Sequence, residues 1–599
     1  MDLSNTTFSE LFVAQQKLLE SRSKDVSLDG KTLTVADVVA ISRGLLTVTV
    51  ASEASKAIGE SSCILKERLE QGEVIYGVNT GFGGSADQRI GATNCLQQRL
   101  FTLLMVGITS TESLIHAGAE FAATCMPEAW VRASMVVRLN SLAAGASGVR
   151  TQITERLCQM LNCDIVPVVP LRGSISASGD LIPLSYIGGV LQGKKYASAF
   201  VGPRLPRGLR RPMRADVALA QANLPPLDVH AKEGLAIVNG TAVSAGVAAL
   251  AAHECMNLAA LSQLLTAMSV EALCGTDESF DPFIAQMRLH PGQIDSAQNI
   301  FHFLEGSSLV NSGQHFEKGA LRQDRYSIRT ASQWIGPVLE DFQLAYVQIS
   351  TELNSVTDNP LVDRLSRRII HGGNFQAKAI TVAVEKLRAG LQSLGRMIFS
   401  QCTELINPNT NRGLPPNLVA DDPATSFLFK GTDIMTAALT SELGFLANPV
   451  GSHVQTAEMG NQGINSLALI SARYTVKAVE TFSQLVAAHI IALCQAIDLR
   501  ARDHFSWKAE NKPDASSLLG CAAKAMYLFV RTELKIPFVT EALVSGDGDF
   551  VSEGVSPSLG LYNTMVYEAI RSGRLNSIVL ECIEGVQEKL ESRKHKSRL

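Results

Sequence analysis

The stretch Leu171-Arg-Gly-Ser-Ile-Ser-Ala-Ser-Gly-Asp-Leu-Ile-Pro-Leu-Ser-Tyr186 has three small residues at its centre, Ala177, Ser178 and Gly179. Glycine has no Cβ, so the chain at Gly179 can take bends that are closed to other residues. In such a bend the Gly179 amide nitrogen can reach the Ala177 carbonyl carbon and close a five-membered ring. Loss of water from that ring and from the Ser178 side chain leaves an exocyclic methylene, an electrophile that no unmodified side chain supplies. The alternative is a Ser/Gly turn that leads into a helix, and an isolated Ala-Ser-Gly would favour it.

Composition places the chain among large globular proteins. Its 599 residues are enough for several domains. Of these residues 46% are hydrophobic and 18% are charged. A net charge of −4 gives no reason to expect nucleic acid or an anionic membrane as a partner. The eleven cysteines are scattered, without a Cys-x-x-Cys pair, which favours reduced thiols in an intracellular protein over disulfides or a zinc site. Met1–Glu10 is polar and lacks the apolar core of a signal peptide.

Two apolar stretches raise the question of a membrane span. Val238–Leu273 is long, but polar residues such as His253 and Glu254 interrupt it, and Leu485–Ile497 is too short to cross a bilayer. We therefore expect two helices that are packed on all sides inside a large bundle or oligomer.

Helical periodicity dominates the chain and predicts a mainly α fold in four parts. We expect a flexible N-terminal arm over 1–27, an N-terminal domain over 28–237, a bundle of long helices over 238–505 and a short helical region over 506–599. Two segments break this pattern. Val74–Gly84 is typical of a short strand that leads into a glycine-rich loop, but it lacks the lysine and the spacing of a phosphate-binding loop. Pro203–Arg214 is basic and broken by prolines, which favours a solvated surface loop.

Six further strings occur along the chain: Tyr76-Gly-Val-Asn-Thr-Gly-Phe82, Val238-Asn-Gly-Thr241, Leu321-Arg-Gln-Asp-Arg-Tyr-Ser-Ile-Arg329, His371-Gly-Gly-Asn-Phe375, Phe429-Lys-Gly431 and Glu458-Met-Gly-Asn-Gln-Gly-Ile-Asn-Ser466. Together with the stretch 171–186 they resemble, in sequence and in order, the aromatic amino acid ammonia-lyases and aminomutases. The strings cover most of 74–502, and residues 459–473 look closer to fungal than to plant members.

The resemblance implies an elongated helical bundle of the histidine/phenylalanine ammonia-lyase type, with a smaller N-terminal domain that carries the cofactor loop. It implies the cofactor 4-methylidene-imidazole-5-one, formed from Ala177, Ser178 and Gly179, and no metal. It also implies a homotetramer in which each active site takes residues from three subunits. One departure follows Ala501: the chain reaches its terminal motif at Phe529 without the long helical insertion that shields the site in plant and fungal members.

Ammonia elimination needs a base for a weakly acidic β-proton, groups that hold the substrate and donors to the cofactor's carbonyl oxygen. By the resemblance, the catalytic residues are Ala177, Ser178, Gly179, the base Tyr76, Tyr326, and Glu458 near the substrate amine. The substrate-binding residues are Leu103, Leu104, Asn239, Gln323, Arg329, Phe375, Lys430, Asn461 and Gln462. Each has an ordinary alternative, such as a surface ion pair for Arg329 or a core position for Phe375.

Spacing adds a geometric prediction for the string that ends at Arg329. Gln323, Tyr326 and Arg329 are three residues apart, so they share a helix face if that segment is helical. The Arg329 guanidinium would then hold a carboxylate by two hydrogen bonds.

A second geometric prediction concerns Glu458, Gln462 and Asn465, which fall at i, i+4 and i+7 of a predicted helix and so face the same way. On a buried face these polar groups need partners, and a bound amino acid would be one. His371 and His453 are expected to be ordinary buried histidines.

The predicted activity is elimination of ammonia from L-phenylalanine to give trans-cinnamate. Leu103 and Leu104 align with the pair that contacts the far end of the ring, where tyrosine-using relatives carry a histidine, so they favour phenylalanine. Glycines in 81–94 favour a loop that opens and releases cinnamate. The alternatives are a phenylalanine 2,3-aminomutase that forms β-phenylalanine, a tyrosine ammonia-lyase, and a non-catalytic helical scaffold derived from the family.

The last residues of the chain suggest an address. Ser597-Arg598-Leu599 fits the tripeptide that a peroxisomal import receptor binds, and basic residues precede it. We expect a peroxisomal protein, and otherwise a cytoplasmic one.

Overall fold

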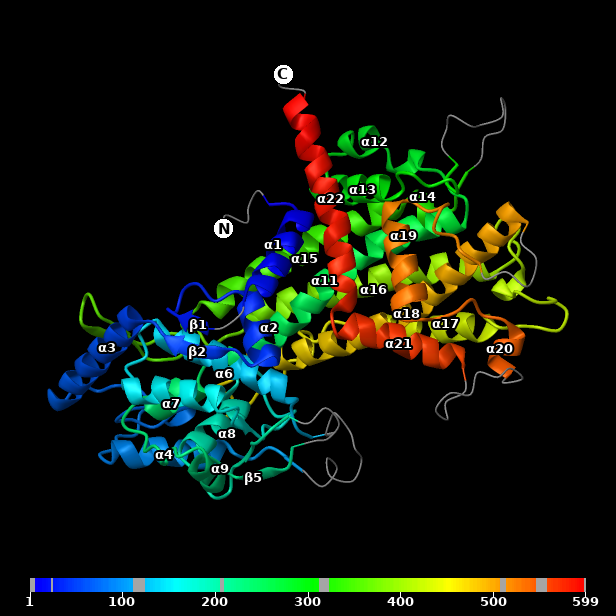
Figure 1. Ribbon diagram of the computed structural model, residues 1–599. Helices are drawn as coiled ribbons and strands as arrows, with labels where there is room; N and C mark the ends of the chain where they lie inside the picture. The colour runs from blue at the N-terminus through cyan, green and yellow to red at the C-terminus, as the bar shows by residue number, and fades with distance from the viewer. Residues whose placement is uncertain are drawn as a thin grey trace.

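The computed structural model describes residues 6–22, 25–110, 124–204, 210–311, 323–506, 513–545 and 557–596 (Figure 1). Ser597, Arg598 and Leu599 lie outside the described residues, so the peroxisomal address stays a prediction. The boundaries of the four expected parts stay predictions too.

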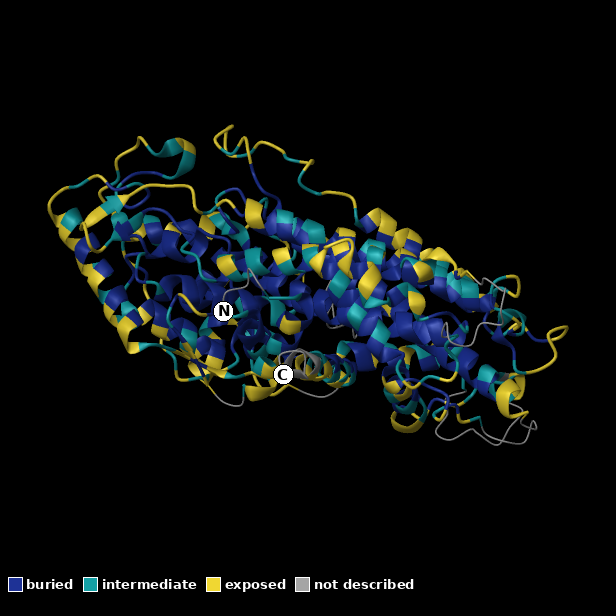
Figure 2. Ribbon diagram, turned by 90° about the horizontal axis from the view of Figure 1, so that it is seen from above, coloured by how far each residue is buried: buried dark blue, intermediate teal, exposed yellow. Residues whose placement is uncertain are grey.

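Long helices form a central bundle, as the sequence predicts (Figure 1). They are α11 (Ala242–Ala272), α15 (Ala331–Leu353), α16 (Lys378–Ile406), α17 (Lys430–Leu446) and α18 (Ala468–Phe505). α16 packs against α15, α17 and α18, and α11 packs against α15, α16 and α18. In Figure 2 the buried residues run along the inner faces of the long helices, and exposed residues lie on the outer faces and in the loops.

α11 and α18 are long and apolar enough to cross a membrane by length and composition alone. In the structure every residue of α11 is buried, and so is the apolar part of α18 from Leu485 to Ile497. A helix that is apolar on all sides needs neighbours on all sides, and the other bundle helices supply them. The expectation of two buried core helices is confirmed.

Shorter helices surround the bundle: α1 (Phe8–Ser21), α2 (Val35–Gly44), α3 (Ser52–Glu70), α4 (Thr93–Leu104), α6 (Glu128–Ala143), α7 (Thr151–Asn162), α8 (Leu181–Leu191), α9 (Ala215–Gln221), α10 (Glu233–Val238), α12 (Pro282–Gln286), α13 (Pro291–Phe303), α14 (Tyr326–Arg329), α19 (Cys521–Leu528), α20 (Glu541–Ser545), α21 (Leu559–Arg571) and α22 (Arg574–Lys596). The strands form small sheets: β1 (Asp25–Leu28) pairs in parallel with β2 (Thr47–Val50), β4 (Ser198–Phe200) pairs antiparallel with β3 (Val166–Pro167) and β5 (Pro212–Arg214), and β6 (Leu361–Asp363) forms a hairpin with β7 (Arg368–Ile370).

Three helices of the N-terminal part position the stretch 171–186. β3 leads into it, and α8 begins immediately after Asp180. α8 packs against α4 and α10. α4 carries Leu103 and Leu104, and α10 ends one residue before Asn239. Three short helices therefore bring the predicted ring residues, an apolar pair and an amide together.

The prediction of a flexible arm over 1–27 is wrong for its described part. Residues 8–21 form α1, and Phe8 and Phe12 are buried against the core. Thr7 and Glu10 cap the helix start reciprocally, which satisfies two backbone N–H groups that the first turn would leave without partners.

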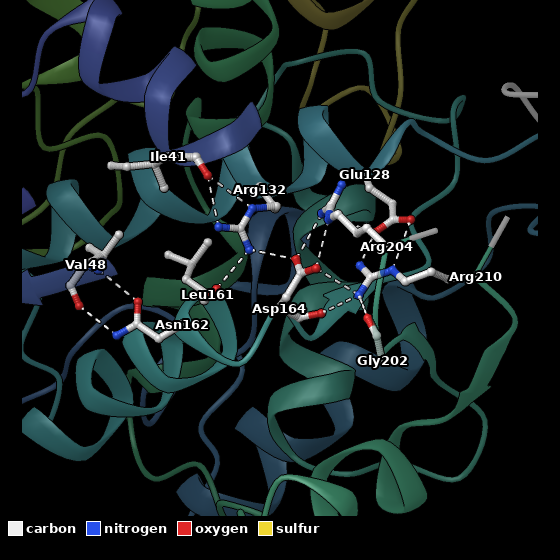
Figure 3. A network of polar contacts seen from close by, with 10 residues as sticks. All are labelled: Ile41, Val48, Glu128, Arg132, Leu161, Asn162, Asp164, Gly202, Arg204 and Arg210. Atoms are coloured by element: carbon white, nitrogen blue, oxygen red, sulfur yellow. Dashed lines mark hydrogen bonds and ion pairs between the residues drawn. The ribbon is translucent and has the colours of Figure 1, made fainter. Parts of the chain in front are cut away.

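The predicted solvated loop over Pro203–Arg214 is exposed at Pro203, Arg204, Arg211 and Arg214, but ion pairs hold Arg204 and Arg210 (Figure 3). Arg204 Nε lies 2.9 Å from Asp164 Oδ2, and Arg210 pairs with both Asp164 and Glu128. Arg210 is buried, so part of this basic segment packs against the body of the protein.

Candidate active site

The stretch 171–186 is anchored by a buried carboxylate. Asp180 is 0% exposed, and its Oδ1 accepts hydrogen bonds of 2.8 Å from Ser174 Oγ and from Ser176 Oγ. Its Oδ2 accepts the backbone N–H of Ser244 at 2.7 Å. Burial raises the pKa of Asp180, and these donors act in the opposite direction. The carboxylate ties the loop before Gly179 to the start of α11.

Two glycines meet where the loop bends. Gly179 has φ +72° and pairs with Gly240, whose φ is +143°. The N–H of Asp180 donates to the Gly240 carbonyl oxygen at 2.8 Å. A Cβ at Gly179 would overlap the backbone of Gly240, so only glycine fits a bend this tight.

Side-chain amides reach the loop from two other segments. Asn239 Nδ2 donates to the Ser178 carbonyl oxygen at 2.6 Å, and Gln462 Nε2 lies 3.1 Å from Ser178 Oγ. Amide donors aimed at a carbonyl oxygen stabilise negative charge that develops there during a reaction. The three small residues are therefore held in a tight bend with donors already in place, an arrangement that suits closure of the predicted ring.

Tyr76 lies in a turn, where the sequence predicts a strand: Asn79 N donates to Ile75 O across it. The Tyr76 hydroxyl oxygen accepts the backbone N–H of Gly83 at 2.8 Å. This hydrogen bond fixes the position of the phenol oxygen beside Gly83. Gly83 has φ +53°, and a Cβ there would overlap the Glu458 carboxylate, so the base and the carboxylate meet around a glycine.

These groups line one cavity of 510 Å³, within the size range of small-molecule sites. The predicted residues that line it are Tyr76, Leu103, Leu104, Ala177, Ser178, Asn239, Phe375, Glu458, Asn461 and Gln462. The lining residues that the sequence analysis did not assign to the site are Phe82, Gly83, Leu100, Leu181, Leu235, Asn359, His371, Gln376 and Ile464. Most of the second group are apolar, so they add a pocket for a hydrophobic group next to the polar loop.

The predicted helix over 458–465 is wrong. Residues 458–462 form a turn in which Glu458 and Met459 have φ of +52° and +53°. The turn still directs Glu458 and Gln462 to the cavity, and Asn461 Nδ2 donates to Glu458 Oε2 at 3.0 Å. Asn465 is buried and donates to Gln455 O at 2.6 Å, so it has a partner inside the protein.

Four predicted site residues lie away from the cavity and are exposed: Gln323, Tyr326, Arg329 and Lys430. The predicted shared helix face is only partly right, because α14 includes Tyr326 and Arg329 but begins after Gln323. Figure 1 places α14 at the opposite end of the molecule from α4 and α8. One chain therefore does not bring these four residues to its own cavity.

Both predicted buried histidines are exposed. His371 lines the cavity, and its ring stands edge-on to that of Tyr76 with the centroids 6.1 Å apart. Its place in the string His371–Phe375 was a signal that could have identified it. Leu235 and Asn359 also line the cavity, and the string at Val238 lies only three residues from Leu235. Among the described residues, no cluster of three or more His, Cys, Asp and Glu side chains could hold a metal ion.

Comparison with known proteins places this cavity in context. A model of the aromatic amino acid lyase family matches residues 33–526. A phenylalanine ammonia-lyase of Aspergillus hancockii is 51% identical over 480 residues, which are 80% of this chain and 68% of that protein. A phenylalanine aminomutase of Talaromyces islandicus, described as forming L-β-phenylalanine, is 46% identical over 81% of this chain and 69% of its own. The chain thus spans about two thirds of the length of these relatives.

A solved structure agrees with the fold. The phenylalanine ammonia-lyase of Rhodosporidium toruloides superimposes with a TM-score of 0.85 at 32% identity, over 97% of this chain and 100% of that chain. The elongated helical bundle that the sequence predicts is confirmed.

Proposed function

Because the chain belongs to the aromatic amino acid lyase family, we propose that it is a carbon–nitrogen lyase that eliminates ammonia from L-phenylalanine to give trans-cinnamate. One observation carries the proposal: Tyr76, Glu458 and Ser178 line a single cavity that is also lined by several leucines. Removal of a β-proton, binding of an amine and binding of an apolar ring are the functions that this reaction needs.

The cofactor 4-methylidene-imidazole-5-one is part of the proposal, and the residues present fit it. Gly179 is held in a bend that only glycine adopts, and Asn239 Nδ2 already donates to the Ser178 carbonyl oxygen. Once formed from residues 177–179, the group would supply an electrophilic methylene at the position of the Ser178 side chain.

The chain's own residues divide the remaining work. Tyr76 Oη, held in place by the Gly83 N–H, takes the β-proton. Glu458, held by Asn461, receives the substrate's amino group. The leucines of α4 contact the phenyl ring.

The substrate's carboxylate needs a cation, and no Lys or Arg side chain is among the described residues that line the cavity of one chain. We propose that Arg329 of a second copy supplies this cation in a homotetramer. Gln323, Tyr326 and Lys430 would come to the site in the same way. The exposure of these four residues and of two apolar side chains supports this: Met459 is 86% exposed, and Ile464, which lines the cavity, is 81% exposed. Large apolar side chains exposed together commonly mark an interaction surface.

Two alternative activities differ from this one either in the product or in the substrate. An aminomutase would add ammonia back to the β-carbon, and the Talaromyces relative keeps this candidate open. A tyrosine lyase would need a partner for a phenol hydroxyl, and much of the cavity lining is apolar, from residues such as Leu100, Leu103, Leu104, Leu181 and Phe82.

Product analysis separates these candidates. Purified protein is incubated with L-phenylalanine, and trans-cinnamate, β-phenylalanine and ammonia are quantified by chromatography and an ammonia assay. We expect cinnamate and ammonia in equal amounts, and a loss of about 10²-fold or more in the Tyr76→Phe variant, which lacks only the base. A mixture dominated by β-phenylalanine would identify an aminomutase, and no turnover of phenylalanine or tyrosine would identify a scaffold.

A further inference from the structure

Arg138, a residue of α6, is completely buried although it carries a charge. Its Nη1 donates to the carbonyl oxygens of Ala236 at 2.6 Å and of Asn239 at 3.0 Å, and its Nη2 donates to Thr357 Oγ1 at 3.1 Å. A buried guanidinium is costly unless its N–H groups find partners. Three acceptors therefore clamp the Nη1 and Nη2 groups of this side chain.

Two of these acceptors belong to the end of α10. The last carbonyl groups of a helix have no partners inside the helix, and Arg138 caps two of them at once. Asn239 is the residue whose side-chain Nδ2 lies 2.6 Å from the Ser178 carbonyl oxygen. The guanidinium thus fixes the backbone of the residue that donates to the loop.

The neighbouring residue is held in the same way. Gly240 accepts the N–H of Asp180 at 2.8 Å, and a Cβ on Gly240 would overlap the Arg138 guanidinium. Arg138 therefore lies against one side of the turn at 239–240, and the loop with Ser178 lies against the other.

Burial lowers the pKa of Arg138, and the negative charges of two carboxylates act in the opposite direction. Asp358 is completely buried, lies 2.5 Å from Lys232 Nζ and accepts a hydrogen bond from Ser147 Oγ at 2.9 Å. Asp180, which anchors the loop, is the second. Buried charged groups, among them Arg138, Asp358 and Asp180, thus lie around the turn at 239–240.

We propose that Arg138 is a positioning residue that holds the Asn239 amide against the Ser178 carbonyl oxygen. Through Asn239 it sets both how completely the ring of residues 177–179 closes and how fast the closed site turns over. This inference rests on the proposed function but concerns a residue that lies outside the cavity.

The same helix offers a matched control. Arg132 is also a buried arginine of α6, and it donates to Ile41 O, Leu161 O and Asp164 Oδ1 (Figure 3). None of its partners lines the cavity. Substitution of Arg132 therefore removes a similar set of buried hydrogen bonds, none of which involves Asn239.

The experiment compares Arg138→Lys and Arg138→Met with Arg132→Lys and Arg132→Met in the full chain. Intact-mass spectrometry gives the fraction of chains that have lost two water molecules, and kcat and KM are then expressed per closed ring. We expect a lower closed fraction in both Arg138 variants, and a fall in kcat of about tenfold or more with little change in KM, because one donor to a reacting oxygen is misplaced. The Arg132 variants should keep the wild-type closed fraction and kcat.

A double mutant tests the route. If Arg138 acts through Asn239, then Arg138→Met should add little to the loss caused by Asn239→Ala. Full additivity, or equal losses in the Arg132 and Arg138 variants, would overturn the inference. Should both Arg138 variants fail to fold, Thr357→Val removes one acceptor and keeps the charge, and it should lower the closed fraction in the same direction; an unchanged closed fraction would refute the clamp. A wild-type chain that has lost no water would instead refute the proposed cofactor.

Discussion

Leu103 and Leu104 line the cavity, and neither side chain can form a hydrogen bond with a substrate hydroxyl. Burying a phenol hydroxyl without a partner costs about 1–3 kcal/mol, so phenylalanine should be preferred over tyrosine. Leu103→His should supply a partner and raise the ratio of kcat/KM for tyrosine to that for phenylalanine by about tenfold, measured by competition between the two substrates. Leu103→Phe, which adds no donor or acceptor, is the control. An unchanged ratio in Leu103→His would mean that the leucines only pack the helix.

Glu271, in α11, gives a pH-dependent prediction. It is 0% exposed, its Oε1 accepts the N–H of Gly520 at 2.6 Å, and burial raises its pKa to about 7 from the ordinary 4.5. The folded protein therefore holds a proton that the unfolded chain releases between these values, and this group's contribution to stability falls as pH rises from 4.5 to 7. Above pH 7 the contribution is constant.

Glu271→Gln removes the titration and keeps an acceptor for Gly520. The thermal midpoints of the variant and the wild type are compared by calorimetry. The midpoint of the variant minus that of the wild type should increase from about pH 4.5 to pH 7 and stay constant at higher pH. A difference between the two midpoints that does not vary with pH would show that Glu271 does not titrate in this range.

At the scale of single residues, the sequence located the groups that stand in recognisable strings. Tyr76, Ser178, Asn239 and Glu458 all line the cavity or touch the loop. It failed for His371, which lines the cavity beside Tyr76, a residue nearly three hundred positions away in the chain. It also gave no sign of Arg138, because a buried arginine has the same appearance in a sequence as an exposed one.

At the scale of elements, α1 is the clearest difference from the sequence prediction. Phe12 is 0% exposed against the core, so Phe12→Ala should cost about 3–5 kcal/mol and lower the thermal midpoint. Glu20, exposed on the same helix, is the control, because a surface substitution there should change stability by less than about 0.5 kcal/mol. Equal midpoints for the two variants would restore the interpretation of a loose arm.

The turn at 458–462 explains the second error at this scale. Spacing of i and i+4 is typical of a helix, but Gly460 has φ +86° and follows two residues that also have positive φ. A right-handed helix cannot continue through such a run. The two glycines of the string, Gly460 and Gly463, were a signal for the turn.

At the scale of the whole molecule, long apolar runs were enough to predict the bundle, because a helix such as α11 that is apolar on all sides has to lie in a core. A sequence of one chain does not specify which site residues a second copy would provide. The exposure of Arg329 and Tyr326 in the structure makes that question testable.

Hybrid oligomers of two inactive variants test whether a second copy provides site residues. Tyr76→Phe and Arg329→Met chains, each inactive alone, are co-expressed with different tags and purified as hybrids. If a site takes Tyr76 from one chain and Arg329 from another, about a quarter of the sites in a random mixture are intact, and activity returns to about that fraction. Tyr76→Phe with Ser178→Ala is the control, because one chain brings both residues to its own cavity. Hybrids without recovered activity would contradict the shared site.

The central claim is that Ser178 provides the electrophile for elimination of ammonia from phenylalanine, and the rate of cinnamate formation by Ser178→Ala tests it most directly. The substitution removes only one oxygen, so the chain should fold and assemble like the wild type. The rate at saturating L-phenylalanine should fall by about 10³-fold or more, because a covalent catalytic group is lost. A folded Ser178→Ala protein that forms cinnamate at close to the wild-type rate would contradict the account.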